Sequence, residues 1–480
     1  MNPDPRESTA APQVTGAPGG REDEASRLRE QVATLRKDVE ALSSQLRETE
    51  GSFGWLFAKK AQQLENALAP RGSRRRALTT AVLSGLRPFV KDGLRTTVRT
   101  RLADRRENRR LAATCARAGE RPSGELGRVL FVSGSFGAME RYRCANPREQ
   151  LSLVGIRTTL LRGAGPEAVR EAGRHDVVVL HRLPFTPVVA EIAEAARRRG
   201  SPVLFDIDDL VFDPGLCERI DALDWMAPAE AALFRQSFGA HRRTLGCCDG
   251  AIVPTEPLAE AMRSLGVRSW IQPNAPSLDL LEISRQARRQ RQADPARVVL
   301  GYASGSRTHN RDFAEAAPAL LQLFARNPAL ELHVVGYLDL DAGWKRFRSR
   351  VKTLEFVPWQ QLPALLATFD VNLAPLEHGN PFCEAKSELK WVEAAAVGVP
   401  TVASPTAPFR KAIRQGETGF LASTTEEWVD VLRLLATDHA RRRAVGAAAA
   451  ESLDADYEPK RLGEALATIL AGLRRDVQRK

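Results

Sequence analysis

Two lysines and a glutamate in the C-terminal half of the chain have the spacing of one helical face. The segment 380–400, NPFCEAKSELKWVEAAAVGVP, predicts a helix over 384–397 that ends at its Gly-Val-Pro tripeptide. Lys386, Lys390 and Glu393 are four and three residues apart, so they would lie side by side. A helix start with two cations suits a diphosphate, because free backbone N–H groups, the helix dipole and the ammonium groups all favour anions. Glu393 is placed to accept hydrogen bonds from ribose hydroxyls, although the spacing alone would favour an ordinary salt-bridged helix.

The same segment resembles the retaining glycosyltransferase family 4. The hallmark of that family is an E-x7-E helix followed by small residues, Gly and Pro, and the run 393–404, EAAAVGVPTVAS, matches the second glutamate and all that follows it. In the family the second glutamate holds the donor ribose, so the resemblance implies this role for Glu393. The first glutamate would stand at 385, where this chain has Ala385 between Glu384 and Lys386. The pattern K-S-x-x-K-x-x-E is similar to that of a subgroup found among O-antigen and rhamnan assembly transferases.

A loop with Gly and basic residues follows the first predicted strand of this half. The run 301–313, GYASGSRTHNRDF, lies where the family places its phosphate-binding Arg and Lys, although the positions do not match one for one. Gly305 allows close approach of the backbone, and Arg307 and His309 are candidate phosphate donors. We therefore expect these three residues to bind the nucleotide together with the helical face described above. The alternative is a plain strand-to-helix turn.

Two glycines and two arginines follow the first strand of the N-terminal half. Gly134 and Gly137 lie in the loop after the strand 129–132, where this kind of fold opens toward a donor or an acceptor. Arg141 and Arg143 come next and are placed to bind an anionic acceptor. We assign Gly137, Arg141 and Arg143 to the acceptor side, with an ordinary surface helix as the alternative.

Other candidate residues end two further strands. His181 ends a predicted strand at a place where enzymes related to family 4 often keep an active-site histidine; the alternative is a structural histidine. Asp206 and Asp208 end the strand 203–206, and alternation puts them on one side. Paired acids suggest a metal ion, but no third ligand accompanies them. We therefore expect an acceptor-side or structural role and no metal.

Short apolar strands that alternate with helical patterns form two series, which predict two Rossmann-like domains. The predicted strands are 129–132, 157–161, 176–181, 203–206 and 251–253, then 298–302, 332–336, 370–374 and 401–403. We expect an acceptor domain over 126–277, a donor domain over 278–455 and a C-terminal helix over 456–480. Two such domains create a cleft at the carboxyl ends of their strands.

The first 125 residues differ in composition from the rest. Residues 1–24 are rich in Pro, Gly, Ala and charge and predict a disordered tail. Residues 25–50 carry Val and Leu in a 4-3 repeat from Leu28 to Leu46, which favours a parallel coiled-coil homodimer over a helix packed on its own chain. The basic segment 51–125 has an amphipathic helical pattern, typical of an anionic membrane surface but also of a solvated face.

The net charge of +11 lies entirely in the stretch 71–121, which holds fifteen Lys and Arg and four Asp and Glu. The neutral remainder, and a basic region that follows the heptads rather than preceding them, argue against a nucleic-acid-binding protein. The sequence shows no secretory signal and no apolar run long enough to span a membrane. Six cysteines without disulfide or zinc spacing indicate a reducing, cytoplasmic location.

These features predict an α/β protein of two Rossmann-like domains (GT-B) with an N-terminal coiled coil and a basic helical extension. The resemblance, over about residues 128–455, implies a retaining hexosyl or deoxyhexosyl transferase. Its donor would be a nucleotide sugar, and its acceptor a cell-surface polysaccharide or lipid-linked glycan at the inner face of the membrane. Lys386, Glu393 and His181 are the catalytic candidates, and no cofactor beyond the nucleotide-sugar co-substrate is expected. The alternatives are a non-catalytic sugar-binding scaffold and a nucleotide-sugar epimerase of the same fold.

Overall fold

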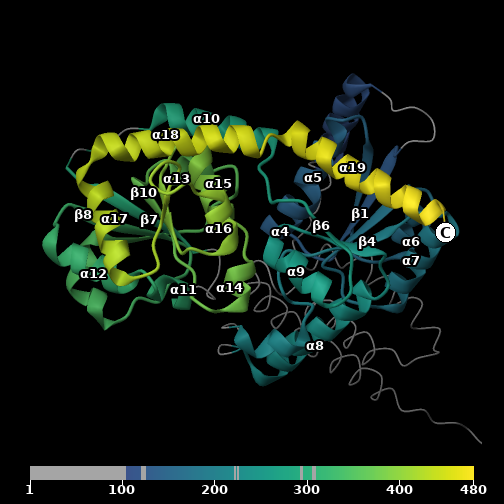
Figure 1. The fold of residues 1–480 in the computed structure, drawn as a ribbon, viewed down its shortest axis with the longest axis horizontal. Coiled ribbons are helices and arrows are strands. Elements are labelled where there is room, and N and C mark those ends of the chain that lie inside the picture. The colour runs from purple at the N-terminus through teal and green to yellow at the C-terminus, as the bar shows by residue number, and fades with distance from the viewer. Residues whose placement is uncertain are drawn as a thin grey trace, which may run out of the picture.

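The structure of the protein is a computed structural model that describes residues 104–119, 126–220, 223, 226–291, 294, 296–304 and 310–479. The chain forms two lobes, each built on a six-stranded parallel sheet (Figure 1). The two Rossmann-like domains of a GT-B fold are therefore confirmed. The predicted tail and coiled coil, and the basic segment before Asp104, lie outside the described residues.

The first sheet has the strand order β2-β1-β3-β4-β5-β6. Its strands are β1 (Arg128–Ser133), β2 (Arg157–Arg162), β3 (Val177–His181), β4 (Val203–Asp206), β5 (Gly250–Val253) and β6 (Ser269–Ile271). Its helices are α4 (Ala138–Glu140), the π-helix Arg141–Ala145, α5 (Asn146–Ser152), α6 (Pro166–Ala172), α7 (Pro187–Arg198), the 3-10 helix Pro214–Arg219, α8 (Pro228–Leu245) and α9 (Glu256–Ser264). The central strands β3 and β4 are buried along their whole length, which explains their unbroken apolar runs.

The second sheet has the strand order β12-β11-β10-β7-β8-β9. Its strands are β7 (Val298–Ala303), β8 (Leu330–Val335), β9 (Val351–Leu354), β10 (Val371–Ala374), β11 (Thr401–Ala403) and β12 (Phe420–Leu421). Its helices are α10 (Leu278–Gln290), α11 (Asn310–Ala314), α12 (Ala317–Arg326), the 3-10 helix Ala342–Arg350, α13 (Leu362–Leu366), α14 (Pro381–Ala385), α15 (Leu389–Ala396), α16 (Ala407–Ala412), α17 (Thr425–Thr437) and α18 (His439–Asp456). The outer strands β6, β9 and β12 were not predicted, because each is short and partly exposed.

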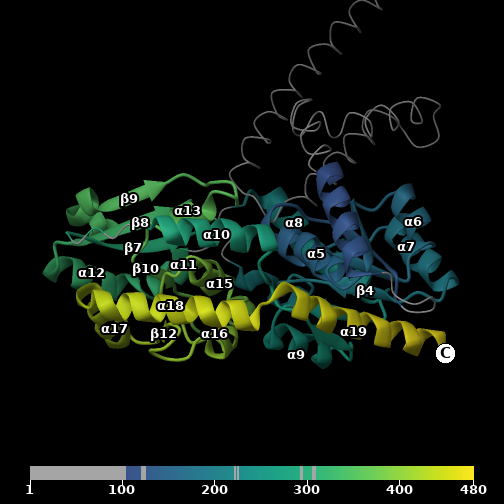
Figure 2. The same ribbon diagram turned by 90° about the horizontal axis from the view of Figure 1, so that it is seen from above.

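The last helix, α19 (Pro459–Gln478), returns to the first domain. In Figures 1 and 2, α18 runs along the second domain and α19 continues across to the first. Leu466, Leu470 and Leu473 of α19 are buried in the core that β1, β3 and α5 share. The C-terminal helix therefore belongs to the core of the first domain, although it follows the second in sequence.

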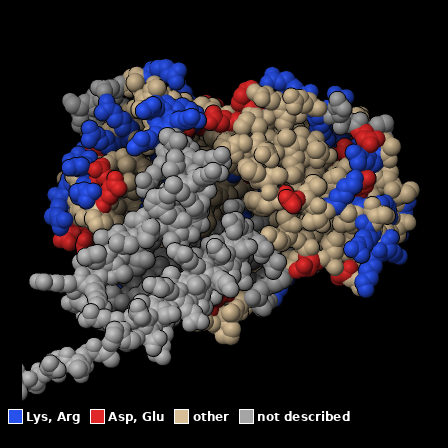
Figure 3. Space-filling model, turned by 180° about the vertical axis from the view of Figure 1, so that it is seen from behind, with Lys and Arg blue, Asp and Glu red and all other residues tan. Residues whose placement is uncertain are grey.

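The end of the basic segment also packs on the first domain. Residues 104–118 form a helix, in which Leu111 and Cys115 are buried. Arg110 of this helix lies 2.6 Å from the buried carboxylate of Glu149 in α5. On the face shown in Figure 3, Lys and Arg are interspersed with Asp and Glu around the edges of both lobes. No helix among the described residues is both long and apolar enough to cross a membrane.

Candidate active site

The strand order of each sheet reverses direction at one point, and the candidate residues gather at these two points. In the first sheet the reversal lies between β1 and β3, and in the second between β7 and β10. Ligands of such sheets bind where the strands end at the reversal. The two points face each other, because the Tyr142 hydroxyl of the first domain donates a 2.7 Å hydrogen bond to Glu393 Oε1 of the second.

The helix predicted over 384–397 is broken into α14 and α15, so the expectation of one continuous face was wrong. Lys386 lies between the two helices in an extended conformation, and Lys390 and Glu393 lie on α15. The break has a physical reason: Phe382 and Ala385 of α14 are buried in an apolar cluster of the first domain, whereas α15 packs in the second. The segment that carries Lys386 is thus held by both domains.

Lys386 has a counter-ion that was not predicted. Its Nζ lies 2.9 Å from Asp312 Oδ2, on α11. Burial would lower the pKa of Lys386, but the charges of Asp312 and Asp209 help to raise it above its usual value. Asp209 belongs to the first domain, so charges from both domains keep this ammonium group protonated.

Lys390 has no such counter-ion. Its Nζ is shielded from solvent and finds no hydrogen-bond acceptor within the described part of the chain. The ammonium group lies 4.4 Å from the ring centroid of Tyr302, at the end of β7. Burial lowers the pKa of Lys390 to about 8, with Asp312 opposing the shift and Lys386 adding to it. A buried cation without an acceptor is costly to the protein unless a ligand supplies an anion.

Glu393 lies half-buried beside these lysines. Burial raises the pKa of its carboxyl group, and the hydrogen bond from Tyr142 and the charge of Arg141 act in the opposite direction. The site therefore combines cations with a carboxylate, which is the pairing that a nucleoside diphosphate requires at its phosphates and its ribose. The expected phosphate-binding residues Gly305, Arg307 and His309 lie outside the described residues, between the end of β7 and α11.

The π-helix of the first domain carries Arg141 and Tyr142 to the domain boundary. The Arg141 guanidinium carbon lies 4.8 Å from the ring centroid of Trp359, which follows β9 in the second domain. Gly137, just before α4, has a φ of 72°, which favours glycine. A single-turn π-helix is often found at a functional site.

Arg143, also on the π-helix, has a different environment. Its guanidinium makes two hydrogen bonds to the Asp206 carboxylate, of 2.9 and 2.7 Å, and both side chains are buried. A third bond of 2.6 Å reaches the carbonyl oxygen of Gln272, in the link between the domains. Arg143 and Asp206 satisfy one another, so we now give this pair a structural role rather than a place on the acceptor side.

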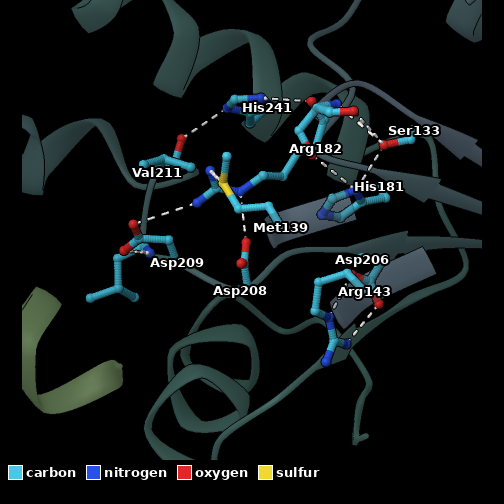
Figure 4. Close-up of polar contacts among 12 residues, drawn as sticks. Ser133, Met139, Arg143, His181, Arg182, Asp206, Asp208, Asp209, Val211 and His241 are labelled. Carbon is cyan, nitrogen blue, oxygen red and sulfur yellow. Dashed lines mark hydrogen bonds and ion pairs between the residues drawn. The ribbon is translucent and has the colours of Figure 1, made fainter. Parts of the chain in front are cut away.

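His181 is the last residue of β3, and only one of its two ring nitrogens has a hydrogen-bond partner among the described residues. Its Nδ1 lies 3.2 Å from Ser133 Oγ (Figure 4). The same nitrogen lies 3.3 Å from Ser135 Oγ. The Ser133 hydroxyl donates to the Ser135 carbonyl oxygen, and we assign the ring proton to Nδ1, whose N–H then donates a hydrogen bond to Ser133 Oγ. Nε2 is then an acceptor, and it has no partner among the described residues. Burial lowers the pKa of His181 to about 3, so the ring is neutral.

Arg182, which follows His181, is the centre of an ion-pair cluster. Its Nε lies 2.7 Å from Asp208 Oδ1 and its Nη2 lies 3.5 Å from Asp209 Oδ2 (Figure 4). Arg182 has a φ of 46°, which is rare for a residue with a side chain. A Cβ atom on Gly134 would lie 2.4 Å from the Arg182 carbonyl oxygen, so only glycine permits this approach. Asp208 thus has an arginine as its partner, and no group of three or more metal-ligand residues occurs among the described residues.

Four residues of this site were not singled out in the sequence: Tyr142, Arg182, Asp312 and Trp359. Arg182 directly follows His181, and Asp312 lies in the segment 301–313; a charged residue at a strand end or after a Gly-containing loop is a recognisable sign of a binding site. Tyr142 and Trp359 act across the domain boundary, which no local pattern reveals.

Residues 311–468, about a third of the chain, match a family model described as glycosyl transferase-like. In this region the chain is therefore glycosyltransferase-like in sequence, in keeping with the resemblance seen in the α15 segment. No curated protein matches the chain in sequence.

Several solved structures are similar to this chain in fold. HepE from Anabaena in complex with UDP has a TM-score of 0.50 at 15% identity, covering 72% of this chain and 100% of that one. Sucrose-phosphate synthase from Thermosynechococcus elongatus has a TM-score of 0.49 at 14% identity, covering 72% and 99%. A putative UDP-N-acetylglucosamine 2-epimerase from Listeria monocytogenes has a TM-score of 0.44 at 12% identity, covering 73% and 98%. The HepE likeness supports the two-domain GT-B fold.

Proposed function

We propose that the protein is a glycosyltransferase that moves a sugar from a nucleotide-sugar donor to a cell-surface polysaccharide or lipid-linked glycan. One observation supports this most directly: Lys390 is a buried cation without an acceptor among the described residues, beside Lys386 and Glu393. The glycosyl transferase-like match covers all three residues.

The chemistry follows from where charge develops. As the anomeric bond breaks, negative charge grows on the nucleoside diphosphate, and fixed cations at that place stabilise the transition state. Lys386 and Lys390 supply such cations, with Arg307 and His309 expected beside them. Glu393 accepts hydrogen bonds from the ribose. Because HepE was solved with UDP, we propose a uridine diphosphate sugar as the first donor to test.

His181 takes part as an acceptor of a hydrogen bond. Its Nε2 lone pair can accept only from a donor such as a sugar hydroxyl, because the ring is neutral and Nδ1 carries the proton. We propose that it orients a hydroxyl of the donor or the acceptor. Gly137 and Asp208 lie on the same side and are proposed to shape the acceptor site without metal. Retention of anomeric configuration, a deoxyhexosyl or hexosyl donor and a place in O-antigen or rhamnan assembly are proposed on the sequence resemblance.

The N-terminal region is proposed to hold this enzyme at the inner face of the membrane. The predicted coiled coil would double the basic segment, and each basic residue near an anionic surface adds roughly 1 kcal/mol. The helix 104–118 is packed on the first domain, so only the residues before it are free for this role in the proposal.

The proposal is tested with purified full-length protein and a panel of UDP, GDP and dTDP sugars. Bound donor must raise the melting temperature. Release of nucleoside diphosphate, accelerated by acceptor, supports transfer. Conversion of the sugar without release of diphosphate would indicate an epimerase, and binding without either reaction would indicate a scaffold.

A further inference from the structure

A second cation with a shielded nitrogen that has no acceptor among the described residues lies on the first-domain side of the site. Arg141 Nη1 is shielded from solvent and has no hydrogen-bond acceptor among the described residues. Its guanidinium carbon lies 4.9 Å from the ring centroid of Tyr142 and 4.8 Å from that of Trp359. Stacking on rings engages the faces of a guanidinium and leaves its N–H donors directed outward in the plane. Arg141 therefore presents hydrogen-bond donors at the domain boundary.

Arg141 and Lys390 lie near the same carboxylate, that of Glu393. The positive charges of Arg141 and of Lys390 each lower the pKa of the Glu393 carboxyl group. The hydrogen bond to Glu393 Oε1 comes from Tyr142, not from Arg141. Arg141 and Lys390 thus both interact with Glu393, while Asp312, whose charge also acts on Lys390, is already paired with Lys386. Buried charge in excess is stable only when a counter-ion joins it.

We infer that Arg141 is a ligand of the donor's diphosphate, supplied by the first domain. The inference rests on the proposed function and adds to it a residue from the domain opposite the lysines. Tyr142 occupies the Glu393 oxygen, so the neighbouring arginine is left for the phosphates. A planar guanidinium matches a phosphate with two parallel hydrogen bonds. Residues of both domains then bind the diphosphate of the donor.

The substitution Arg141→Met tests this, because methionine keeps an apolar stem against the rings and removes the charge and the donors. Arg268→Met is the matched control: Arg268, just before the edge strand β6, also stacks on a ring, that of Trp270 in β6. Wild type is first titrated with UDP, GDP and dTDP and with the three uncharged nucleosides. We expect Arg141→Met to lower the affinity for the preferred diphosphate by about ten- to a hundredfold and to leave the affinity for the corresponding nucleoside unchanged. Arg268→Met should change neither.

Equal weakening of diphosphate and nucleoside would show that Arg141 only packs against Trp359, and would overturn the inference. An unchanged diphosphate affinity would overturn it as well. Failure of the wild type to bind any of the three diphosphates would instead refute the proposed function, before any variant is compared. If Arg141→Met does not fold, Arg141→Gln is measured in the same way, and the ratio of the two affinities decides.

Discussion

The unpaired ammonium group of Lys390 predicts an unusual pH dependence of nucleotide binding. Burial lowers the pKa of Lys390 to about 8 in the free protein. A diphosphate beside it would stabilise the charged form and raise that pKa. Binding then takes up a proton above about pH 8, so affinity should be constant below that pH and fall as the pH rises through it.

The size of the effect follows from the pKa. If the pKa in the complex lies above the range studied, affinity falls about tenfold per pH unit, and should be roughly thirtyfold weaker at about pH 9.5 than at about pH 7. Two neighbouring groups do not titrate in this pH range. Nearby carboxylates raise the pKa of Lys386 above its usual value, and burial raises that of Cys383 to about 12. The Tyr142 hydroxyl also titrates well above its usual pKa, because it is buried.

Isothermal titration of UDP, or whichever diphosphate the panel selects, measures this in buffers of different ionisation enthalpy. Lys390→Met should bind about ten- to a hundredfold more weakly at neutral pH and lose the pH dependence. Because Lys390→Met lacks the ammonium group, any pH dependence that this variant retains comes from titration of the nucleotide itself. Lys345→Met, an exposed lysine of the same domain, should behave as wild type. A flat wild-type profile, or the same slope in Lys390→Met, would refute the assignment of Lys390 to the diphosphate.

Three further predictions concern transfer, metal and the N-terminus. Lys386→Ala and Glu393→Ala should each reduce the turnover number by on the order of 10²-fold or more in protein that remains folded by circular dichroism, and near-wild-type turnover in both would contradict the donor site. EDTA should leave activity unchanged, because Asp208 is paired with Arg182; a Mg²⁺ or Mn²⁺ requirement that disappears in Asp208→Asn would show the opposite. Removal of residues 1–103, which spares the packed helix 104–118, should abolish salt-sensitive co-sedimentation with anionic vesicles and dimer formation while a soluble acceptor is still used. Equal co-sedimentation of both forms would make the basic segment a spacer.

The fold was accessible from the sequence because its central strands are buried on both faces. Such strands are continuous apolar runs, and the nine predicted ones are all present. Of the edge strands, β2 was predicted, whereas β6, β9 and β12 are short and partly exposed and lacked this signal. The helix predicted over 384–397 failed at Lys386, because Phe382 packs against the other domain, and tertiary contacts override local helical spacing.

The part of the candidate site that could be predicted is the part that depends on local sequence features. Lys390, Glu393 and His181 could be named as candidates because they lie in a motif or at a strand end, which are local features. The partners that give these residues their properties are remote in sequence: Tyr142 meets Glu393 over 251 positions, and Asp312 meets Lys386 over 74. Arg143 was assigned to the acceptor because a basic residue after a glycine loop does not reveal its buried carboxylate partner.

The most direct test of the proposed glycosyl transfer is release of nucleoside diphosphate from a nucleotide sugar by the full-length protein. Each UDP, GDP and dTDP sugar is incubated with wild type, Lys390→Met and Lys345→Met, with and without a lipid-linked glycan acceptor, and labelled sugar is followed into the glycan. We expect one preferred donor, diphosphate released in step with labelled glycan, and loss of both in Lys390→Met alone. Wild type that releases no diphosphate from any donor, or a Lys390→Met variant as active as Lys345→Met, would contradict it.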